Sequence, residues 1–441
     1  MFGLYGNGFW SDTTWMFLKE YALFFILGIL FCMPIATRMN KLMVDGARFS
    51  KPLELVYPIT IIVLFLVCVS YLVKGTSMHN FFAKKRITAF LFILVLVTFS
   101  VLNIIQSFGP IQKTLASADY HYSEAKELIH ELDDDINEHV FEKFGFVEAY
   151  GYMQSLMWKN EENNFEVVKD MEGKLHYTYF ATGPTDTKDL SDRVAALGAH
   201  LDPNTKLTYV MTPDKYVRGY TQFPEGIPYN YNNETADGFL ANLKQDGIDT
   251  VDLREGLLES GIPAKDLFFT TDHHWKIKTA FWAFGQLVKH LDGMYDKPLD
   301  PDHYFTDLNN YNGRKAGKYF AGDDDFDLIY PKFKTDYSFY FKTGDTEATL
   351  NGRFEDALLT TYPLNVQGAT YDLTADKYFT YLYGNQGIVH VVNKDKPNGL
   401  KVLFIKDSLA VPMISFLSTV VSEIYLIDPR FFLPPPFRYD L

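Results

Sequence analysis

Cysteine is nearly absent from this chain of 441 residues. Its two cysteines, Cys32 and Cys68, both lie inside apolar runs, and none follows residue 110. A disulfide framework or a cysteine-based zinc site is therefore excluded from the long polar part of the chain. That part is large enough to bury a core that needs no covalent cross-link.

Positive charge is also in deficit, because the net charge of the whole chain is −14. Residues 1–110 hold nine Lys or Arg and four Asp or Glu, so this segment carries +5 and the remainder carries −19. A basic apolar segment followed by an acidic polar one is typical of a membrane segment joined to a soluble domain. The acidic balance argues against a nucleic-acid partner, which requires clustered basic side chains.

Three apolar runs without a charge occupy residues 21–37, 57–73 and 87–105. Each has seventeen to nineteen residues, close to the roughly 20 that a helix needs to cross a bilayer core. We expect about three transmembrane helices, of which the first is marginal in length and carries Pro34. On length alone, buried helices of a soluble core remain the alternative.

The basic residues around these runs predict the orientation of the chain. Lys84, Lys85 and Arg86 directly precede the third run, and no basic residue follows it closely. The positive-inside rule then places the polar domain outside the cytoplasm. The loop between the first two runs is also basic, although alternation of the helices would place it outside. We rely on the third run because the difference in charge between its two ends is sharper. We therefore expect a multi-pass protein of the cell membrane with an extracytoplasmic carboxyl-terminal domain.

Strand and helix patterns alternate in the polar part of the chain. We expect strands at 206–212, 400–406 and 422–428. Between such strands the apolar residues recur at helical spacing, most clearly over 274–291. Apolar strands that alternate with helices favour an α/β fold with a mainly parallel sheet and helices on both faces. Residues 303–395 are rich in Tyr, Phe, Asp, Gly and Asn and indicate irregular loops with β segments.

Two motifs carry groups suited to nucleophilic catalysis. "TTDHHW" contains Asp272 and His274, and "FIKDSLA" contains Ser408 where a strand is expected to turn into a helix. A serine hydroxyl needs a base to take its proton, and a histidine can do so when an acid holds its other nitrogen. We assign Ser408 as nucleophile, His274 as base and then acid, and Asp272 as the orienting group. By spacing alone, Asp272 as a plain helix N-cap is an equal alternative.

Together with "YVMTPDKY" (209–216) and "EIYLIDPRFF" (423–432), these motifs resemble the DHHW family and occur in the family's order. That family is SGNH-hydrolase-like and related to the periplasmic alginate O-acetylation proteins, and the resemblance spans about residues 78–432. It implies an SGNH-like fold and a triad at Asp272, His274 and Ser408. Family members usually continue past "DPR", so the resemblance also implies a truncated carboxyl end.

Residues 1–75, from "FGLYGNGFW" to "VSYLVKG", resemble the carboxyl-terminal helices of membrane-bound O-acyltransferases (MBOAT proteins). The catalytic histidine of that family lies upstream, and residues 1–75 contain no histidine, so we expect no acyltransferase activity from this piece alone. We divide the chain into an MBOAT-like fragment (1–77), an anchor (78–110) and an extracytoplasmic domain (111–441). They are joined by natural fusion or by an error of gene assembly. The resemblance implies a full-length MBOAT partner that exports acyl groups.

Four further residues are candidates for substrate binding. Trp275 suits a sugar platform or ordinary packing, and Arg430 suits an anionic polymer or a salt bridge. Asn312 and Gly313, in "YNGR", are candidate oxyanion donors. His273 is a candidate metal ligand, but adjacent side chains diverge and no third ligand is evident. We expect neither a metal nor a cofactor.

The leading hypothesis is a membrane-anchored O-acetyltransferase that acts on a cell-surface or exported polysaccharide. Two alternatives stay open at this point. An esterase with the same triad would use water as the acceptor. A non-catalytic surface protein would position the polymer or act as a scaffold for the acyltransferase.

Overall fold

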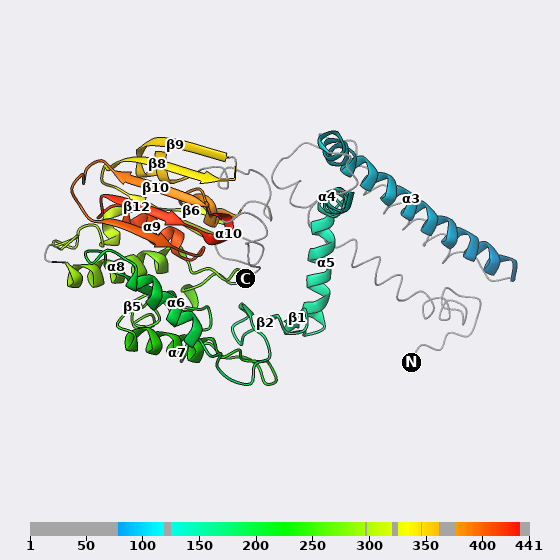
Figure 1. Ribbon diagram of the computed structural model, residues 1–441. Coiled ribbons are helices and arrows are strands. Elements are labelled where there is room, and N and C mark those ends of the chain that lie inside the picture. Colours follow the sequence, from blue (N-terminus) through cyan, green and yellow to red (C-terminus); the bar gives the residue numbers. More distant parts are fainter. Residues whose placement is uncertain are drawn as a thin grey trace. The chain divides into compact units, whose positions relative to one another are not determined.

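The protein is described here by a computed structural model (Figure 1), which covers residues 78–118, 125–295, 298–319, 325–344, 346–360 and 376–432. The chain divides into two compact units, Met1–Lys159 and Asn160–Leu441, and each is described by itself. The apolar runs at 21–37 and 57–73 lie outside the described residues. Two of the three expected membrane helices therefore stay predictions.

The described part of the first unit is helical. Helix α3 (Met78–Ser117) is followed by α4 (Ala125–Glu138) and α5 (Lys143–Leu156). Within the described ranges, one segment of α3, Thr88–Ser117, is long and apolar enough to cross a membrane, with a mean hydropathy of 2.5. Its apolar side chains are exposed, which suits a helix whose surroundings are lipid.

The carboxyl-terminal half of α3 is fastened to the segments that follow it. Thr114 Oγ1 donates a hydrogen bond of 2.5 Å to Asp135 in α4. The backbone N–H of Phe141 donates to Asn103 Oδ1 in α3 at 2.6 Å. Phe99 packs its ring edge-on against Phe141 at 6.0 Å. These contacts make α3, α4 and the start of the next segment one folded piece.

The described residues of the second unit form four sheets. β4 (Thr208–Met211) and β5 (Asp249–Asp252) form a parallel pair. The largest sheet has five strands in the order β11 (Lys401–Ile405), β12 (Glu423–Ile427), β10 (Ile388–Asn393), β8 (Asp336–Thr343) and β9 (Thr346–Arg353). The others are the antiparallel pair β6 (Tyr311–Lys318) and β7 (Asp325–Pro331), and a small antiparallel sheet of β1 (Glu161–Glu162), β2 (Val167–Lys169) and β3 (Leu175–Tyr177).

The expectation of a mainly parallel sheet is wrong. Only β4–β5 and β11–β12 pair in parallel among the described strands, and the other pairings are antiparallel. The difference comes from residues 303–395, for which the sequence predicts irregular loops with β segments. They supply β6 to β10, and the hairpin β8–β9 joins the sheet through β10 (Figure 1). Burial alternates along β8, as expected of an antiparallel strand with one face on the core.

The α-helices in the described part of the second unit are α6 (Lys188–Ala199), α7 (Asn232–Gln245), α8 (Ile277–Met294), α9 (Ala410–Leu417) and the short α10 (Pro429–Phe432). α6 packs on α7, and α7 packs on β5. α8 and α9 pack together, and every residue of α9 is buried. These two helices follow the two catalytic motifs directly, so their packing brings the motifs together.

Phe416 of α9 lies at the centre of this core and is fully buried. Its ring packs edge-on against Phe281 of α8 at 5.1 Å and parallel to Phe354 at 6.2 Å. It also meets Tyr311 and Tyr381 at 5.8 and 5.7 Å. One side chain thus connects α8, α9, β6 and the segments around the large sheet.

We predict that Phe416→Ala lowers the free energy of unfolding of the second unit by about 3–5 kcal/mol, because a large aromatic side chain leaves a cavity in a packed core. Guanidinium unfolding of the detergent-solubilised chain measures the effect. Leu190→Ala, on the exposed face of α6, is the control and should change stability by less than about 0.5 kcal/mol. Similar losses for both variants would contradict this account of the core.

Candidate active site

A tight hairpin carries the motif "TTDHHW". Phe268 and Trp275 form an antiparallel bridge, and the backbone N–H of Phe269 donates to the carbonyl of His274 at 3.1 Å. Residues 270–273 are left at the tip of the hairpin. The backbone, rather than a helix end, therefore sets where the Asp-x-His pair points.

Asp272 is not the N-cap of the following helix. α8 begins at Ile277 with Lys276 in the cap position. The carboxylate of Asp272 instead accepts a hydrogen bond of 2.8 Å from the backbone N–H of His274. The N-cap alternative is thus excluded, because Asp272 closes the turn that holds the imidazole.

Ser408 lies where the sequence places it, between the end of β11 at Ile405 and the start of α9 at Ala410. The carboxylate of Asp407 accepts a hydrogen bond of 3.0 Å from the backbone N–H of Leu409, and this bond closes the strand-to-helix turn. Ser408 is only 8% exposed. Its hydroxyl is therefore held in a defined place instead of turning freely in water.

The three predicted side chains form a continuous hydrogen-bonded relay. His274 Nδ1 lies 2.7 Å from Asp272 Oδ1, and His274 Nε2 lies 2.8 Å from Ser408 Oγ. With the proton on Nδ1, the ring donates to the carboxylate and accepts from the hydroxyl. This is the arrangement that a serine nucleophile needs to lose its proton to a histidine.

The electrostatics of the relay favour an ionised Asp272. Burial raises the pKa of its carboxyl, but the hydrogen bonds and charge of His274 outweigh burial and leave the pKa below its ordinary value. The carboxylate is therefore negative at neutral pH. A negative group behind the imidazole stabilises the imidazolium that forms when His274 accepts a proton.

Tyr378 is a buried residue that connects the two catalytic motifs. Its ring stacks on the His274 imidazole, with ring centres 4.0 Å apart. Its hydroxyl accepts a hydrogen bond from Trp275 Nε1 at 2.9 Å and donates to the Leu409 carbonyl at 3.0 Å. Tyr378 thereby fixes the histidine hairpin relative to the serine turn.

Two buried lysines hold the hairpin from its other side. Lys215 Nζ donates to the carbonyls of Thr270 and Asp272, both at 2.9 Å. Lys174 Nζ donates to the carbonyl of Phe268 at 3.3 Å. These bonds fix the backbone before and within the turn that carries the carboxylate. The sequence predicts Lys215 at the end of a strand, as a residue that lines the pocket, and gives no sign of its bonds to the hairpin.

A buried charge cluster lies below the serine turn. Lys406 Nζ lies 3.0 Å from Asp428 Oδ2, and the side chains of both residues are almost inaccessible. Arg430 donates two hydrogen bonds to the same carboxylate, at 3.0 and 2.8 Å. The cluster ties the carboxyl ends of β11 and β12 together, directly before Ser408.

The structure gives a different outcome for each of the candidate substrate-binding residues. Trp275 is fully buried and its indole N–H is bonded to Tyr378, so the expectation of a substrate contact there is wrong and the residue packs. Arg430 forms a salt bridge with Asp428. This is the second of the two roles that the sequence left open for it. Asn312 and Gly313 lie in β6, paired with β7, and their role as oxyanion donors stays a prediction.

His273 projects from the hairpin tip next to the relay. Asp272, His273 and His274 offer three ligand atoms within 4.8 Å of one another. The ring nitrogens of His274 and the carboxylate of Asp272 already serve the relay. The arrangement therefore fits proton transfer better than metal binding.

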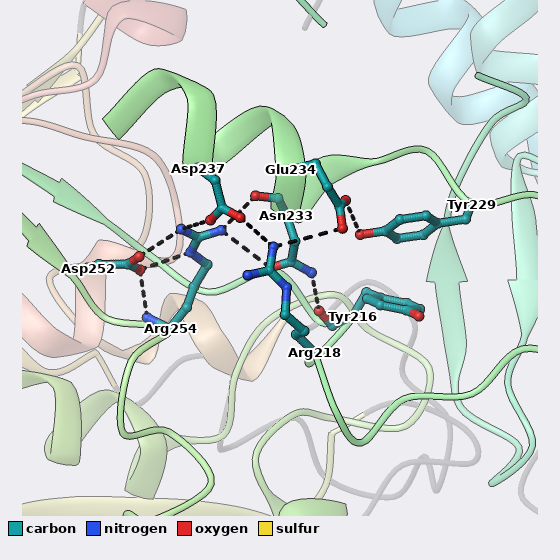
Figure 2. Close-up of polar contacts among 8 residues, drawn as sticks. All are labelled: Tyr216, Arg218, Tyr229, Asn233, Glu234, Asp237, Asp252 and Arg254. Carbon is teal, nitrogen blue, oxygen red and sulfur yellow. Dashed lines mark hydrogen bonds and ion pairs between the residues drawn. The ribbon is translucent and has the colours of Figure 1, made fainter. Parts of the chain in front are cut away.

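A cavity of about 240 Å³ opens next to β4 and β5, and its lining includes none of the triad residues. Figure 2 shows its two arginines, both already engaged by carboxylates. Arg254 pairs with Asp252 at 2.7 Å and with Asp237 at 2.8 Å, and Arg218 pairs with Asp237 at 2.6 Å. This network fastens α7 to the loops after β4 and β5, and the relay remains the better candidate for chemistry.

Comparison with known families gives a match within the second unit. Residues 180–311 match the family described as "SGNH hydrolase-like domain, acetyltransferase AlgX". This segment is SGNH hydrolase-like. The match includes Asp272 and His274 and ends before Ser408. The SGNH-like fold expected from the motifs is confirmed, and we call the second unit the SGNH-like unit. The MBOAT resemblance of residues 1–75 stays a prediction.

Solved structures were also compared with the chain. PatB1 of Bacillus cereus with a sulfonyl adduct is 18% identical, has a TM-score of 0.47, and covers 60% of this chain and 86% of its own. A DHHW family protein from Eubacterium siraeum is 18% identical, has a TM-score of 0.44, and covers 62% and 86%. The O-acetyltransferase domain of Pseudomonas putida AlgJ is 15% identical, has a TM-score of 0.27, and covers 38% and 66%. The chain matches no curated relative.

The charge cluster predicts how stability depends on pH. Burial raises the pKa of the Asp428 carboxyl, but Arg430 and Lys406 outweigh burial and lower it below the ordinary value of 3.8. The stabilisation is therefore complete above pH 3.8 and is lost as the pH falls through the lower folded-state pKa. Asp428→Asn should cost about 3–5 kcal/mol at neutral pH, since Lys406 stays buried without its carboxylate.

Urea unfolding between pH 2 and pH 7 measures both effects. Asp336→Asn, which removes a half-exposed partner of Lys394, is the matched control and should cost about 1 kcal/mol or less. Asp428→Asn should also flatten the acid limb of the stability curve. Equal losses for the two variants, or an unchanged acid limb, would show that the cluster does not stabilise the turn.

Proposed function

We propose that the SGNH-like unit transfers an acetyl group to a hydroxyl of a cell-surface or exported polysaccharide, with Ser408 as nucleophile. One observation carries the proposal, namely the relay in which His274 lies 2.7 Å from Asp272 and 2.8 Å from Ser408. The matching family is described as an acetyltransferase, and this description favours acetyl over other acyl groups. No step in the reaction below requires a metal or a cofactor.

In the first half-reaction, Ser408 Oγ attacks the carbonyl carbon of the acetyl donor while its proton passes to His274 Nε2. The bond between that carbon and the leaving group then breaks, and the leaving group takes the proton from His274. The products are acetyl-Ser408 and the deacetylated donor. The imidazole is neutral again and ready for the second half.

In the second half-reaction, a sugar hydroxyl takes the place of the leaving group. His274 accepts the hydroxyl proton as the sugar oxygen attacks the acetyl-Ser408 carbonyl. Ser408 leaves and recovers its proton from His274, and the sugar carries the ester. An esterase would run the same step with water, so the acceptor alone separates the two activities.

Helix α3 is the reason for placing the reaction at the membrane. α3 is long and apolar enough to cross a bilayer, and we propose that it holds the SGNH-like unit at the outer face of the cell membrane. The resemblance of residues 1–75 to MBOAT proteins supports a full-length MBOAT protein as the partner that delivers acetyl groups across the membrane.

Ser408→Ala should lower turnover of p-nitrophenyl acetate by at least about a thousandfold, because the nucleophile is lost. The variant should also lose labelling by a fluorophosphonate probe, whereas Ser155→Ala, in α5, should keep both. Acceleration of acetyl-donor consumption by added oligosaccharide would distinguish the transferase from the esterase. Full activity of Ser408→Ala, or a folded wild type that the probe does not label, would refute the proposal and favour a scaffold.

Lys215 is a positioning residue, since it acts on the triad only through the backbone of the hairpin. Lys215→Met should lower kcat for p-nitrophenyl acetate by about 10- to 100-fold, the effect of a displacement near 1 Å in a catalytic group. KM should change much less, and Lys215→Arg should recover part of kcat by donating to the same carbonyls. An unchanged kcat in a folded Lys215→Met variant would exclude this role.

A further inference from the structure

A row of aromatic rings leads outward from the relay to the protein surface. The ring of His273 lies 4.0 Å from that of His274, and the ring of Tyr177 lies 6.0 Å from that of His273, edge to face. The row thus begins at the imidazole that is bonded to Ser408 and ends on β3. Only its inner member is used by the reaction described above.

The outer two rings are accessible, in contrast to the rest of the site. Tyr177 is 64% exposed and the His273 side chain is 47% exposed, whereas the His274 side chain is 5% exposed. Two accessible aromatic rings next to a reactive group offer a surface on which a ligand can pack. A molecule that reaches the Ser408 hydroxyl from this side has to pass over these two rings.

The position of Tyr177 is fixed by the catalytic hairpin itself. The backbone N–H of Leu175, two residues earlier in β3, donates to the Thr270 carbonyl at 2.9 Å. Lys174 reaches the Phe268 carbonyl from the same strand. β3 is therefore bonded along the hairpin, and Tyr177 keeps its place beside His273 without any ligand present.

The chemistry of the two rings suits a sugar better than an ionic or purely apolar ligand. A pyranose ring has an apolar face of C–H groups that packs on an aromatic ring, and an edge of hydroxyls that needs polar partners. Burial and the neighbouring charges of His274 and Lys215 lower the pKa of His273, so its imidazole is neutral near pH 7. A neutral imidazole can both donate to and accept from a hydroxyl.

We propose that Tyr177 and His273 form a platform on which one sugar unit of the acceptor polysaccharide stacks, next to the unit that receives the acetyl group. This inference rests on the proposed transfer reaction and adds the binding site for its acceptor. The sugar packs its apolar face on Tyr177, and a hydroxyl of the same unit bonds to His273. The neighbouring unit then extends over His274 toward acetyl-Ser408.

The test compares acceptor use with turnover of a small ester in the same preparations of full chain. The acceptors are the pentasaccharides of β-1,4-linked glucose, β-1,4-linked N-acetylglucosamine and α-1,4-linked glucose, with p-nitrophenyl acetate as donor. Tyr177→Ala should raise the acceptor concentration at half-saturation about tenfold, the effect of a contact worth about 1.4 kcal/mol. Tyr177→Trp, which keeps a flat ring, should stay near the wild type.

Tyr179→Ala is the matched control, because Tyr179 is 51% exposed and follows the same strand. It should leave acceptor half-saturation unchanged. The platform is refuted if Tyr177→Ala does not change half-saturation, or if it lowers acceptor use and ester turnover in equal proportion. An active wild type that none of the acceptors accelerates, or a wild type without ester turnover, would instead refute the transfer reaction itself.

Discussion

The imidazole of His274 joins two segments that lie 134 residues apart in the sequence. Its two ring nitrogens bind Asp272 two residues away and Ser408 near the end of the described chain. A single hydrogen bond is worth only about 1 kcal/mol net and cannot bring such distant segments together. The packing of α8 on α9 does so, since these helices directly follow the two motifs and share the aromatic core around Phe416. The relay is thus a consequence of the core, and its accuracy depends on the groups that hold each motif.

Those groups hold the elements that carry the reacting atoms. Lys215 fixes the hairpin through its carbonyls, and Tyr378 links the histidine ring to the turn after Ser408. Lys406 and Asp428 tie β11 to β12 below the same turn. Each of these residues is buried, where a polar group left without its partner is costly. Because of this burial, losing one of these partners lowers the free energy of unfolding. The same burial keeps the hydroxyl and the imidazole in line for proton transfer.

The sequence was sufficient for the local features of the site but not for the sheet. Residue types and order predicted that Ser408 follows a strand and that Asp272 and His274 act together, because these features depend on a few neighbouring residues and on the family motif. Strand pairing depends on partners far along the chain, so the segment 303–395 was not recognised as the source of five antiparallel strands. Tyr378 lies in that segment and gave no local signal. For Trp275 the sequence left a sugar platform and ordinary packing open, because burial of a side chain next to a motif is decided by tertiary packing.

The central claim is that the acetyl group resides covalently on Ser408 between donor and acceptor. Rapid acid quenching of the wild-type chain during turnover of an acetyl donor, followed by mass spectrometry of the peptide that spans residues 407–430, tests it most directly. The account predicts an acetyl ester on Ser408 that appears within the first turnover and disappears when acceptor is added. A chain that turns over donor while this peptide stays unmodified, or that carries the acetyl group on another residue, would contradict it.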